Sequence, residues 1–252
     1  MYNKIISLFI STGAYASFLQ RILELARKRQ SSYICVANVH MTIEAHWDKE
    51  FAKVVNNANL VTPDGMPLVK AMHLLYGVKQ DRVAGMDFLP DLLQEAEKIG
   101  LSVFFYGGTQ QMLDKTQEYV KSHYPTLEHQ HYYSPPFRAL TKVEEQAIVN
   151  RINESGAHLV FVALGCPKQE KWMASMKGKI NACMLGIGGA LPVMIGMQKR
   201  APQWMQKMML EWLYRLAQEP QRLFKRYFIT NTVFIYLLTK QFISIKVLGG
   251  RG

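Results

Sequence analysis

The segment HLVFVALGCPKQ, residues 158–169, changes character partway along its length. It begins with an apolar run of strand length, continues as a loop of small residues, and reaches Pro167 where a helix would begin. Proline suits the first turn of a helix because its φ is already helical and its missing N–H would have had no partner there. The segment therefore predicts a strand that runs through a short loop into a helix, the repeating unit of a parallel α/β sheet.

The same order of strand and helix recurs along the chain. Apolar runs of strand length are found at residues 5–10, 33–37, 60–62, 102–106, 158–163 and 182–185. Apolar residues at helical spacing are found at residues 16–29, 41–57, 87–98, 110–123 and 142–154. This alternation predicts an α/β fold with a Rossmann-like, mostly parallel sheet flanked by helices, which we expect to occupy residues 1–195.

Positive charge is concentrated at the C-terminal end of the protein. Of a formal net charge of +11 over 252 residues, +8 belongs to residues 199–252, where ten Lys or Arg residues stand against two Glu residues. A basic tail on a nearly neutral body favours a polyanion, an anionic membrane or a phosphorylated substrate as its partner.

Residues 196–252 are predicted to form a basic, aromatic-rich helical appendage. The alternation of strands and helices stops near residue 200, and Pro220 predicts a break between two helical pieces. The longest apolar run, residues 227–238, is well short of the ~20 residues that a helix needs to span a bilayer. Attachment to a membrane surface therefore fits better than a crossing, although a solvated helix with one core-facing stripe has the same composition.

Three arginines of the appendage recur at regular intervals. Arg215, Arg222 and Arg226 are seven and four residues apart, which brings them near one stripe if a helix continues past the proline. A basic and aromatic stripe of this kind can hold a phosphate or contact anionic lipid.

Two loops that follow predicted strands carry candidate anion sites. Gly107 and Gly108 precede the helix at residue 110, and Lys168 and Gln169 open the helix after Pro167. Helix N-termini at the carboxyl ends of parallel strands favour anions. Neither loop matches GxGxxG or a Walker sequence, and glycines often follow strands for structural reasons alone.

A third loop, LVTPDG at residues 60–65, carries a carboxylate out of an apolar strand. Pro-Asp-Gly is common turn chemistry, because Pro fixes φ, Asp bonds its own backbone and Gly accepts a positive φ. The residues alone leave open both a plain turn and a catalytic loop built around Asp64.

Several chemistries lack their sequence signatures. The chain has no GxSxG elbow and no HExxH, and Cys35, Cys166 and Cys183 lie in apolar runs without ligand spacing, as buried reduced thiols do. It also lacks Asp-x-Asp, the carboxylate pair that brings Mg²⁺ or Mn²⁺ to a nucleotide diphosphate, so we expect no metal site and expect arginines and helix dipoles to neutralise such a ligand. The N-terminal apolar run carries one basic residue, Lys4, and no cleavage signal, which indicates a strand and not a signal peptide.

A series of motifs between about residues 33 and 226 closely resembles the WecG/TagA/CpsF glycosyltransferases (glycosyltransferase family 26). In order, the motifs are ANVH at 37–40, VTPDG at 61–65, RVAGMD at 82–87, FFYGG at 104–108, FVALGCPKQEKW at 161–172, GIGG at 186–189, RAP at 200–202 and EWLYRL at 211–216.

The resemblance implies an inverting, metal-independent glycosyltransferase without a cofactor, which takes a hexose or N-acetylhexosamine from a UDP-sugar. It implies as acceptor a polyprenyl-diphosphate-linked saccharide at the cytoplasmic face of the membrane, in cell-surface polysaccharide synthesis. Residues 1–195 would be the catalytic domain, and residues 196–252 would complete the site and contact the membrane. Asp64 matches the proposed general base.

The resemblance also implies the residues that bind substrate. Arg215, Arg222 and Arg226 would lie over the donor diphosphate, Gln169 near the sugar and Asn38 at a strand end facing the site, whereas the motif of Arg82 and Gly85 has no role that chemistry assigns. The full set of implied binding residues is Asn38, Arg82, Gly85, Gly107, Gly108, Lys168, Gln169, Gly188, Gly189, Arg215, Arg222 and Arg226.

The chain departs from the family pattern at two places. Where some members have Thr-Pro-Asn, it has Ala37 before Asn38, and where some have an Asp after a Gly-Gly-Ser, it continues from Gly189 into Ala190-Leu191-Pro192. Both departures bear on which donor sugar is accepted.

Two other functional classes remain alternatives from the sequence. One is a non-catalytic module that binds anionic lipid or nucleic acid through the basic tail, although no nucleic-acid recognition fold is found and we expect no nucleic-acid partner. The other is a nucleotide-sugar hydrolase or epimerase on a similar fold. The sequence leaves the oligomeric state, including a homo-oligomer, open.

Overall fold

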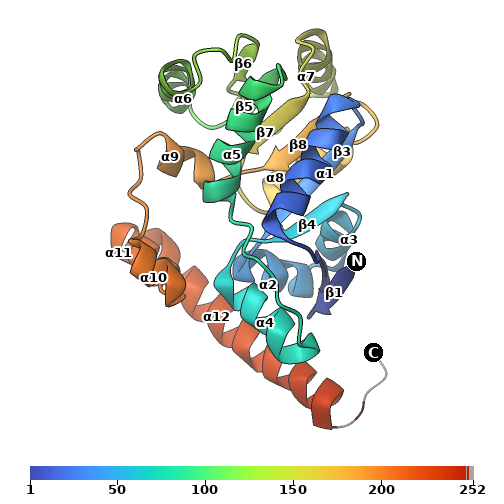
Figure 1. The fold of residues 1–252 in the computed structure, drawn as a ribbon, viewed down its shortest axis with the longest axis vertical. Helices are drawn as coiled ribbons and strands as arrows, with labels where there is room; N and C mark the ends of the chain where they lie inside the picture. The colour runs from blue at the N-terminus through green and yellow to red at the C-terminus, as the bar shows by residue number, and fades with distance from the viewer. Residues whose placement is uncertain (248, 250–252) are drawn as a thin grey trace.

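The computed structural model describes residues 1–247 and 249, and shows a parallel sheet with helices on both faces (Figure 1). Six strands form the sheet in the order β4-β3-β8-β7-β5-β6, and every neighbouring pair is parallel. The strands are β3 (Ser32–Ala37), β4 (Leu60–Pro63), β5 (Val103–Gly107), β6 (Gln130–Tyr133), β7 (Leu159–Ala163) and β8 (Cys183–Gly186). The predicted α/β class with a mostly parallel sheet is confirmed.

The helices of the body follow the strands in alternation. They are α1 (Tyr15–Arg27), α2 (Val39–Trp47), α3 (Lys49–Asn56), α4 (Met66–Tyr76), α5 (Gly85–Lys98), α6 (Gln110–His123), α7 (Lys142–Glu154), α8 (Lys168–Met176) and α9 (Ala190–Met194). Each sheet face has its own apolar core, because successive side chains of a strand point to opposite faces. Cys35 of β3 packs into the core that contains α2, α3, α4, α7 and α8, whereas Ile34 packs into the core that contains α1, α5, α6 and α9.

Two predicted elements are divided in the structure. Residues 5–10 were predicted as one strand, but they belong to an antiparallel hairpin of β1 (Tyr2–Ile5) and β2 (Leu8–Ser11), which turns at Ile6 with a φ of 56°. Residues 41–57 were predicted as one helix, but Asp48 ends α2 and caps α3 by accepting from the N–H of Phe51. Both breaks lack the Gly or Pro that would mark them in the sequence.

The C-terminal segment contains α10 (Gln203–Lys207), α11 (Glu211–Gln218), α12 (Pro220–Phe242) and a π-helical turn, η1 (Ile243–Val247). The break predicted at Pro220 is confirmed, because α11 ends at Gln218 and α12 begins at the proline. Residues 248 and 250–252, the end of the predicted appendage, lie outside the described residues.

Helix α12 lies along α2 and α4 of the body (Figure 1). It buries Leu223, Thr230 and Phe234, and it leaves Phe224 and Phe228 on its outer face 62% and 68% exposed. Residues 220–246 are long and apolar enough, by length and composition, to cross a membrane, and 11% of the most apolar window is buried. The predicted apolar run, residues 227–238, covers only the middle of this segment, because α12 begins at Pro220 and the helical backbone continues past Lys240 and Gln241.

Candidate functional site

A cavity of about 780 Å³ lies where the strands end. Its walls come from the loops after β3, β4, β7 and β8 on one side and from α10, α11 and α12 on the other. Ligands of parallel α/β sheets bind at the carboxyl ends of the strands, and the volume suits a small-molecule substrate. The body and the C-terminal helices therefore build this site together.

Eleven of the thirteen residues predicted for the site line the cavity: Asn38, Asp64, Arg82, Gly85, Lys168, Gln169, Gly188, Gly189, Arg215, Arg222 and Arg226. Gly107 and Gly108 are not among the lining residues. A Cβ atom at Gly107 would lie 2.8 Å from the carbonyl oxygen of Ala163, so this glycine lets the ends of β5 and β7 approach closely.

Asp64 is held in place by hydrogen bonds on both sides of its turn. Its N–H donates to the carbonyl of Ala37 at the end of β3 (2.8 Å), and the N–H of Val83 donates to the carbonyl of Pro63 (2.8 Å). Its side-chain Oδ1 accepts from the N–H of Gly85 (3.2 Å). The turn is thus tied to two neighbouring segments, which fixes the carboxylate at the cavity wall.

The pKa of Asp64 is raised to about 6. Burial is the largest cause and the negative charge of Glu211 adds to it, whereas Arg82, Arg215 and the N–H of Gly85 lower the pKa. A carboxylate with this pKa is mostly ionised at neutral pH, yet it is more basic than an ordinary Asp. Those are the properties that a general base needs.

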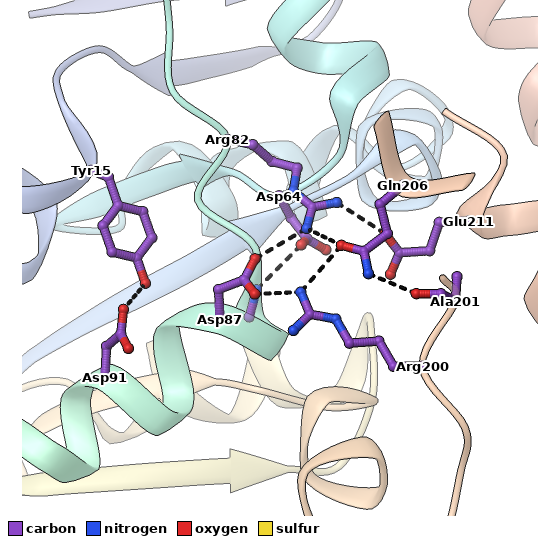
Figure 2. A network of polar contacts seen from close by, with 10 residues as sticks. Tyr15, Asp64, Arg82, Asp87, Asp91, Arg200, Ala201, Gln206 and Glu211 are labelled. Carbon is purple, nitrogen blue, oxygen red and sulfur yellow. Dashed lines mark hydrogen bonds and ion pairs between the residues drawn. The ribbon is translucent and has the colours of Figure 1, made fainter. Parts of the chain in front are cut away.

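Arg82 connects the body to the C-terminal helices (Figure 2). Its guanidinium donates to Glu211 of α11 (3.0 Å), Asp87 of α5 (3.0 Å) and Gln206 of α10 (3.1 Å), and Arg200 forms a second ion pair with Asp87. A planar guanidinium can satisfy several acceptors at fixed angles, which an ammonium group does less well. Arg82, whose role could not be assigned from its motif, therefore positions α10 and α11 over the cavity.

Gln169 occupies space that two glycines leave open. Its Oε1 accepts from the N–H of Gly165 (3.1 Å) and its Nε2 donates to Glu170 (2.7 Å). A Cβ atom at Gly186 would lie 2.7 Å from Nε2, and one at Gly188 would lie 3.2 Å from Oε1. The GIGG motif is therefore needed, at least at these positions, to admit the buried Gln169 side chain.

The three predicted arginines do not share one helical stripe. Arg215 belongs to α11 and lies against Gly189, where an added Cβ would be 2.6 Å from its Nη2. Arg222 and Arg226 belong to α12; Arg222 is ion-paired with Glu219, whereas Arg226 lies where α12 packs against α2. The condition for one stripe, a helix that continues past the proline, is not met because α11 ends before Pro220, although all three side chains still line the cavity.

Other polar residues of the site were given no role from the sequence. Glu211 and Glu170 stand in quoted motifs, but a motif does not show which partner a side chain will meet. Glu170 is fully buried, burial raises its pKa, and its Oε2 has no hydrogen-bond partner among the described residues. Asn38 has a structural role as well, because its Oδ1 accepts from the N–H of Met41 and caps α2.

Within the described residues, no group of three or more His, Cys, Asp or Glu side chains is arranged to hold a metal ion. The charged side chains that line the cavity are those of Asp64, Glu211, Glu219, Lys168, Arg82, Arg215, Arg222 and Arg226. Arginines can bind phosphate oxygens in pairs, so the arrangement suits a phosphorylated ligand.

Fold and cavity together define a Rossmann-like α/β protein in which Asp64, a carboxylate of raised pKa, faces a cationic wall at the carboxyl edge of the sheet. Residues 3–247 match the model of the glycosyl transferase WecG/TagA/CpsF family. The chain belongs to this family and is a glycosyltransferase, as the resemblance predicted.

Curated relatives share about a third or less of their residues with the chain. A Staphylococcus aureus (strain MW2) protein is 28% identical over 215 residues, which are 85% of this chain and 82% of the relative. A Bacillus spizizenii protein is 31% identical over 196 residues, which are 77% of this chain and 74% of the relative. Both relatives are named N-acetylglucosaminyldiphosphoundecaprenol N-acetyl-beta-D-mannosaminyltransferase.

Proposed function

We propose that this protein is an inverting, metal-independent glycosyltransferase that moves a hexose or N-acetylhexosamine from a UDP-sugar to a polyprenyl-diphosphate-linked saccharide. The observation that carries the proposal is Asp64, a single carboxylate with a pKa of about 6 on the wall of an arginine-lined cavity. The reaction serves the synthesis of a cell-surface polysaccharide, at the cytoplasmic face of the membrane.

The relatives support the nature of the acceptor. Their names describe a sugar joined through a diphosphate to undecaprenol, a lipid that stays in the membrane. The outer face of α12, with exposed Phe224 and Phe228, offers apolar surface for contact with that membrane. The protein would therefore attach to the membrane surface and meet its acceptor there.

Asp64 would act on the hydroxyl group of the acceptor. In the proposed step the carboxylate takes the hydroxyl proton while the oxygen attacks the anomeric carbon of the donor. The bond from that carbon to the diphosphate oxygen breaks, and the electron pair leaves with UDP. One carboxylate suffices because no covalent sugar–enzyme intermediate forms, and attack from the face opposite the leaving group inverts the anomeric centre.

The leaving diphosphate gains negative charge as the bond breaks. Arg215 lies at the Gly189 loop and is one of the charges that act on Asp64, so it is near the reacting groups. A cation placed there stabilises the transition state more than the bound substrate. This arrangement supports charge neutralisation by arginine, in a chain that lacks an Asp-x-Asp sequence.

The direct test is the Asp64→Asn variant, assayed with a panel of UDP-sugars and a prenyl-diphosphate-linked N-acetylglucosamine. The variant keeps the shape of the side chain and removes the base, so we expect sugar transfer to be lost. Retained turnover would refute the general-base role. NMR of the wild-type product reports the anomeric configuration, and an assay in EDTA reports the metal requirement.

Folding of Asp64→Asn is the control. Because the folded-state pKa of this Asp is raised above its ordinary value, its charge destabilises the folded protein. That penalty is absent below about pH 4, grows as the pH rises toward 6 and is complete above it, where it amounts to about 3 kcal/mol. The variant should therefore melt no lower than the wild type at pH 8.

The family match decides against a non-catalytic binding module. A nucleotide-sugar hydrolase or epimerase is distinguished by its products. We expect a labelled sugar to appear on the lipid acceptor when acceptor is present, and little free or epimerised sugar in its absence. A product that forms equally without acceptor would favour the hydrolase or epimerase.

A further inference from the structure

The reaction proposed above contains two diphosphates, one that leaves with the donor nucleotide and one that joins the acceptor sugar to its lipid. Their positions relative to the reacting atoms differ. The donor diphosphate is bonded directly to the anomeric carbon, whereas the acceptor diphosphate is separated from the attacking hydroxyl by at least the width of a sugar. A site for both substrates therefore needs one cationic group near the base and another farther from it.

The cavity has cationic groups in both kinds of position. Arg215, against Gly189 at the end of β8, is among the charges that act on Asp64. Arg226 is not among them, and it acts instead on His40 in the first turn of α2. Arg215 therefore lies against the loop after β8, whereas Arg226 lies on the cavity wall formed by α12, which packs on α2.

Polar groups at Arg226 and His40 lack partners. Nε of Arg226 and Nδ1 of His40 are buried and have no hydrogen-bond partner within the described part of the chain. Burial, with the nearby charge of Arg226, lowers the pKa of His40 to about 4, so the imidazole is neutral at pH 7 and its distance of 3.7 Å from Glu44 is no ion pair. Buried polar atoms without partners are costly, and a ligand with acceptor oxygens would satisfy Nε–H of Arg226 and, in the tautomer that carries its proton on Nδ1, His40 as well.

Apolar surface also adjoins Arg226. The cavity around Arg226 is lined by apolar side chains of α2, among them Val39 and Met41, whereas Phe224 and Phe228 lie on the outer face of α12. Tyr227, Thr230 and Asn231 of the same helix line the cavity. A ligand bound here would place a charged group beside Arg226 and an apolar group against Val39, Met41 and Tyr227, which is the chemistry of a lipid diphosphate.

Arg222 is less suited than Arg215 or Arg226 to bind either of the two diphosphates. Its guanidinium is ion-paired with Glu219, which also accepts from the side chain of Gln198, and its side chain is 60% exposed. No carboxylate pairs with Arg226 among the residues that the structure describes. The charge of Arg226 is therefore the more available of the two on α12.

We propose that the arginines divide the two substrates between them: Arg215 binds the leaving diphosphate of the donor, and Arg226 with His40 binds the diphosphate of the lipid-linked acceptor. The proposal rests on the proposed function, and it assigns to the acceptor an arginine that the family resemblance had placed over the donor. It also makes the contact between α2 and α12 the entry side for the lipid.

The test compares Arg226→Met and Arg215→Met in two measurements, the KM for a soluble short-chain prenyl-diphosphate N-acetylglucosamine and the dissociation constant for UDP. We expect Arg226→Met to raise the acceptor KM roughly 10- to 100-fold, the loss typical of a charge-assisted hydrogen bond, and to leave UDP binding within about twofold. Arg215→Met should weaken UDP binding instead. Weaker UDP binding by Arg226→Met with an unchanged acceptor KM would overturn the assignment.

A second acceptor separates a diphosphate contact from general damage. Arg226→Met should lower turnover of an N-acetylglucosamine alkyl glycoside, which has no diphosphate, much less than that of the diphosphate acceptor; equal losses would contradict the proposal. Lys225→Met is the matched control, because this exposed neighbour loses the same charge and does not line the cavity. It should change neither constant.

Two further measurements keep the test decisive. If Arg226→Met folds poorly, Arg226→Lys retains the charge without the planar fork, and it should still raise the acceptor KM while UDP binding is kept. If the wild type transfers no sugar at all, the proposed function fails, but calorimetric binding of the prenyl-diphosphate sugar still reports whether Arg226 holds it. Equal binding by wild type and Arg226→Met would then reject the inference on its own.

Discussion

Gly186 and Gly188 show how a single missing carbon atom can shape this site. Each would place a Cβ within 3.2 Å of the Gln169 amide, so each glycine sets where that side chain can lie. Glu170 and the N–H of Gly165 then fix which end of the amide is the donor and which is the acceptor. The orientation of Gln169 is thus determined by its surroundings before any substrate arrives.

A double-mutant cycle tests this role of Gly186. Gly186→Ala should lower kcat severalfold or more, because the new methyl group overlaps the position of Nε2 and displaces the Gln169 amide. In a Gln169→Ala background the same change should cost little further activity, since the overlapping atoms are gone. Kinetics of the four proteins measure the coupling, and two additive losses would show that Gly186 acts independently of Gln169.

The pH dependence of the reaction reports on Asp64. Since the base must be unprotonated, kcat/KM should rise with pH through an apparent pKa near 6. Glu211→Gln should shift this limb to lower pH, because it removes a negative charge that raises the pKa and frees Arg82 to act on Asp64. Initial rates between about pH 4.5 and 8 measure this rise in kcat/KM for the wild type and for Glu211→Gln. A limb that stays in place or moves to higher pH would contradict the influence of Glu211.

At the residue scale, the sequence indicated which residues belong to the site better than it indicated which contacts their side chains make. Asp64 and the arginines could be found because their motifs are distinctive. Glu170 and Glu211 stand in the same motifs, yet their roles depend on contacts between segments that no local pattern encodes, such as the bond from Arg82 across to α11. Gly107 matched a motif as well, and its visible task is close packing of β5 against β7.

Among the elements, α12 has two faces with different tasks. Its inner face is packed on α2 and α4 through residues such as Phe234, which is 4% exposed, whereas Phe228 on the outer face is 68% exposed. A helix of this kind is held by the body and remains free to contact something else with its outer face. The length of α12 could not be read from hydropathy alone, because polar residues near its end interrupt the apolar run without ending the helix.

The contributions of the two faces of α12 to stability and to membrane binding can be distinguished by a pair of matched substitutions. Phe234→Ala should lower the free energy of unfolding by about 3 kcal/mol, the cost of removing a buried phenylalanine. Phe228→Ala should leave stability within about 0.5 kcal/mol and weaken binding to anionic liposomes. Thermal melts and liposome sedimentation measure the two effects. Equal liposome binding by Phe228→Ala and the wild type would argue against membrane contact through this face.

The order of strands and helices was predictable at this scale, because apolar runs and helical periods are strong local signals. The hairpin at the N-terminus was missed because Ile6 is not a residue typical of turns. The break at Asp48 was missed although Asp is a favoured N-cap residue, because the apolar spacing was taken to continue across it. Pro220 was predicted to break the helix, but a proline does not give the direction in which the chain continues, so the positions of the three arginines relative to one another could not be predicted.

Over the whole molecule, charge and chemistry are distributed unevenly. The body holds Asp64, while the basic C-terminal segment holds the arginines over the same cavity. That segment carries +8 of the net charge of +11, so binding to an anionic surface should weaken with salt. The prediction of a separate domain boundary near residue 195 stays a prediction, because the cavity wall is shared between the two parts.

Deletion of residues 200–252 should remove both donor turnover and liposome binding. The truncated protein loses Arg215, Arg226 and the exposed face of α12, and it also uncovers the apolar surface of α2 and α4. Turnover, liposome sedimentation and circular dichroism would be measured together. Normal turnover by a folded truncation would show that the appendage does not complete the site.

The far end of α12 is joined to the beginning of the chain. Gln241 accepts from the N–H of Ile6 (2.9 Å) and donates to the carbonyl of Lys4 (2.9 Å), so the helix end is tied to the turn of the N-terminal hairpin. This link constrains how relatives can be recombined in the laboratory. A chimera that takes its C-terminal helices from one relative and its sheet from another should also take residues 1–11 from the donor of the helices.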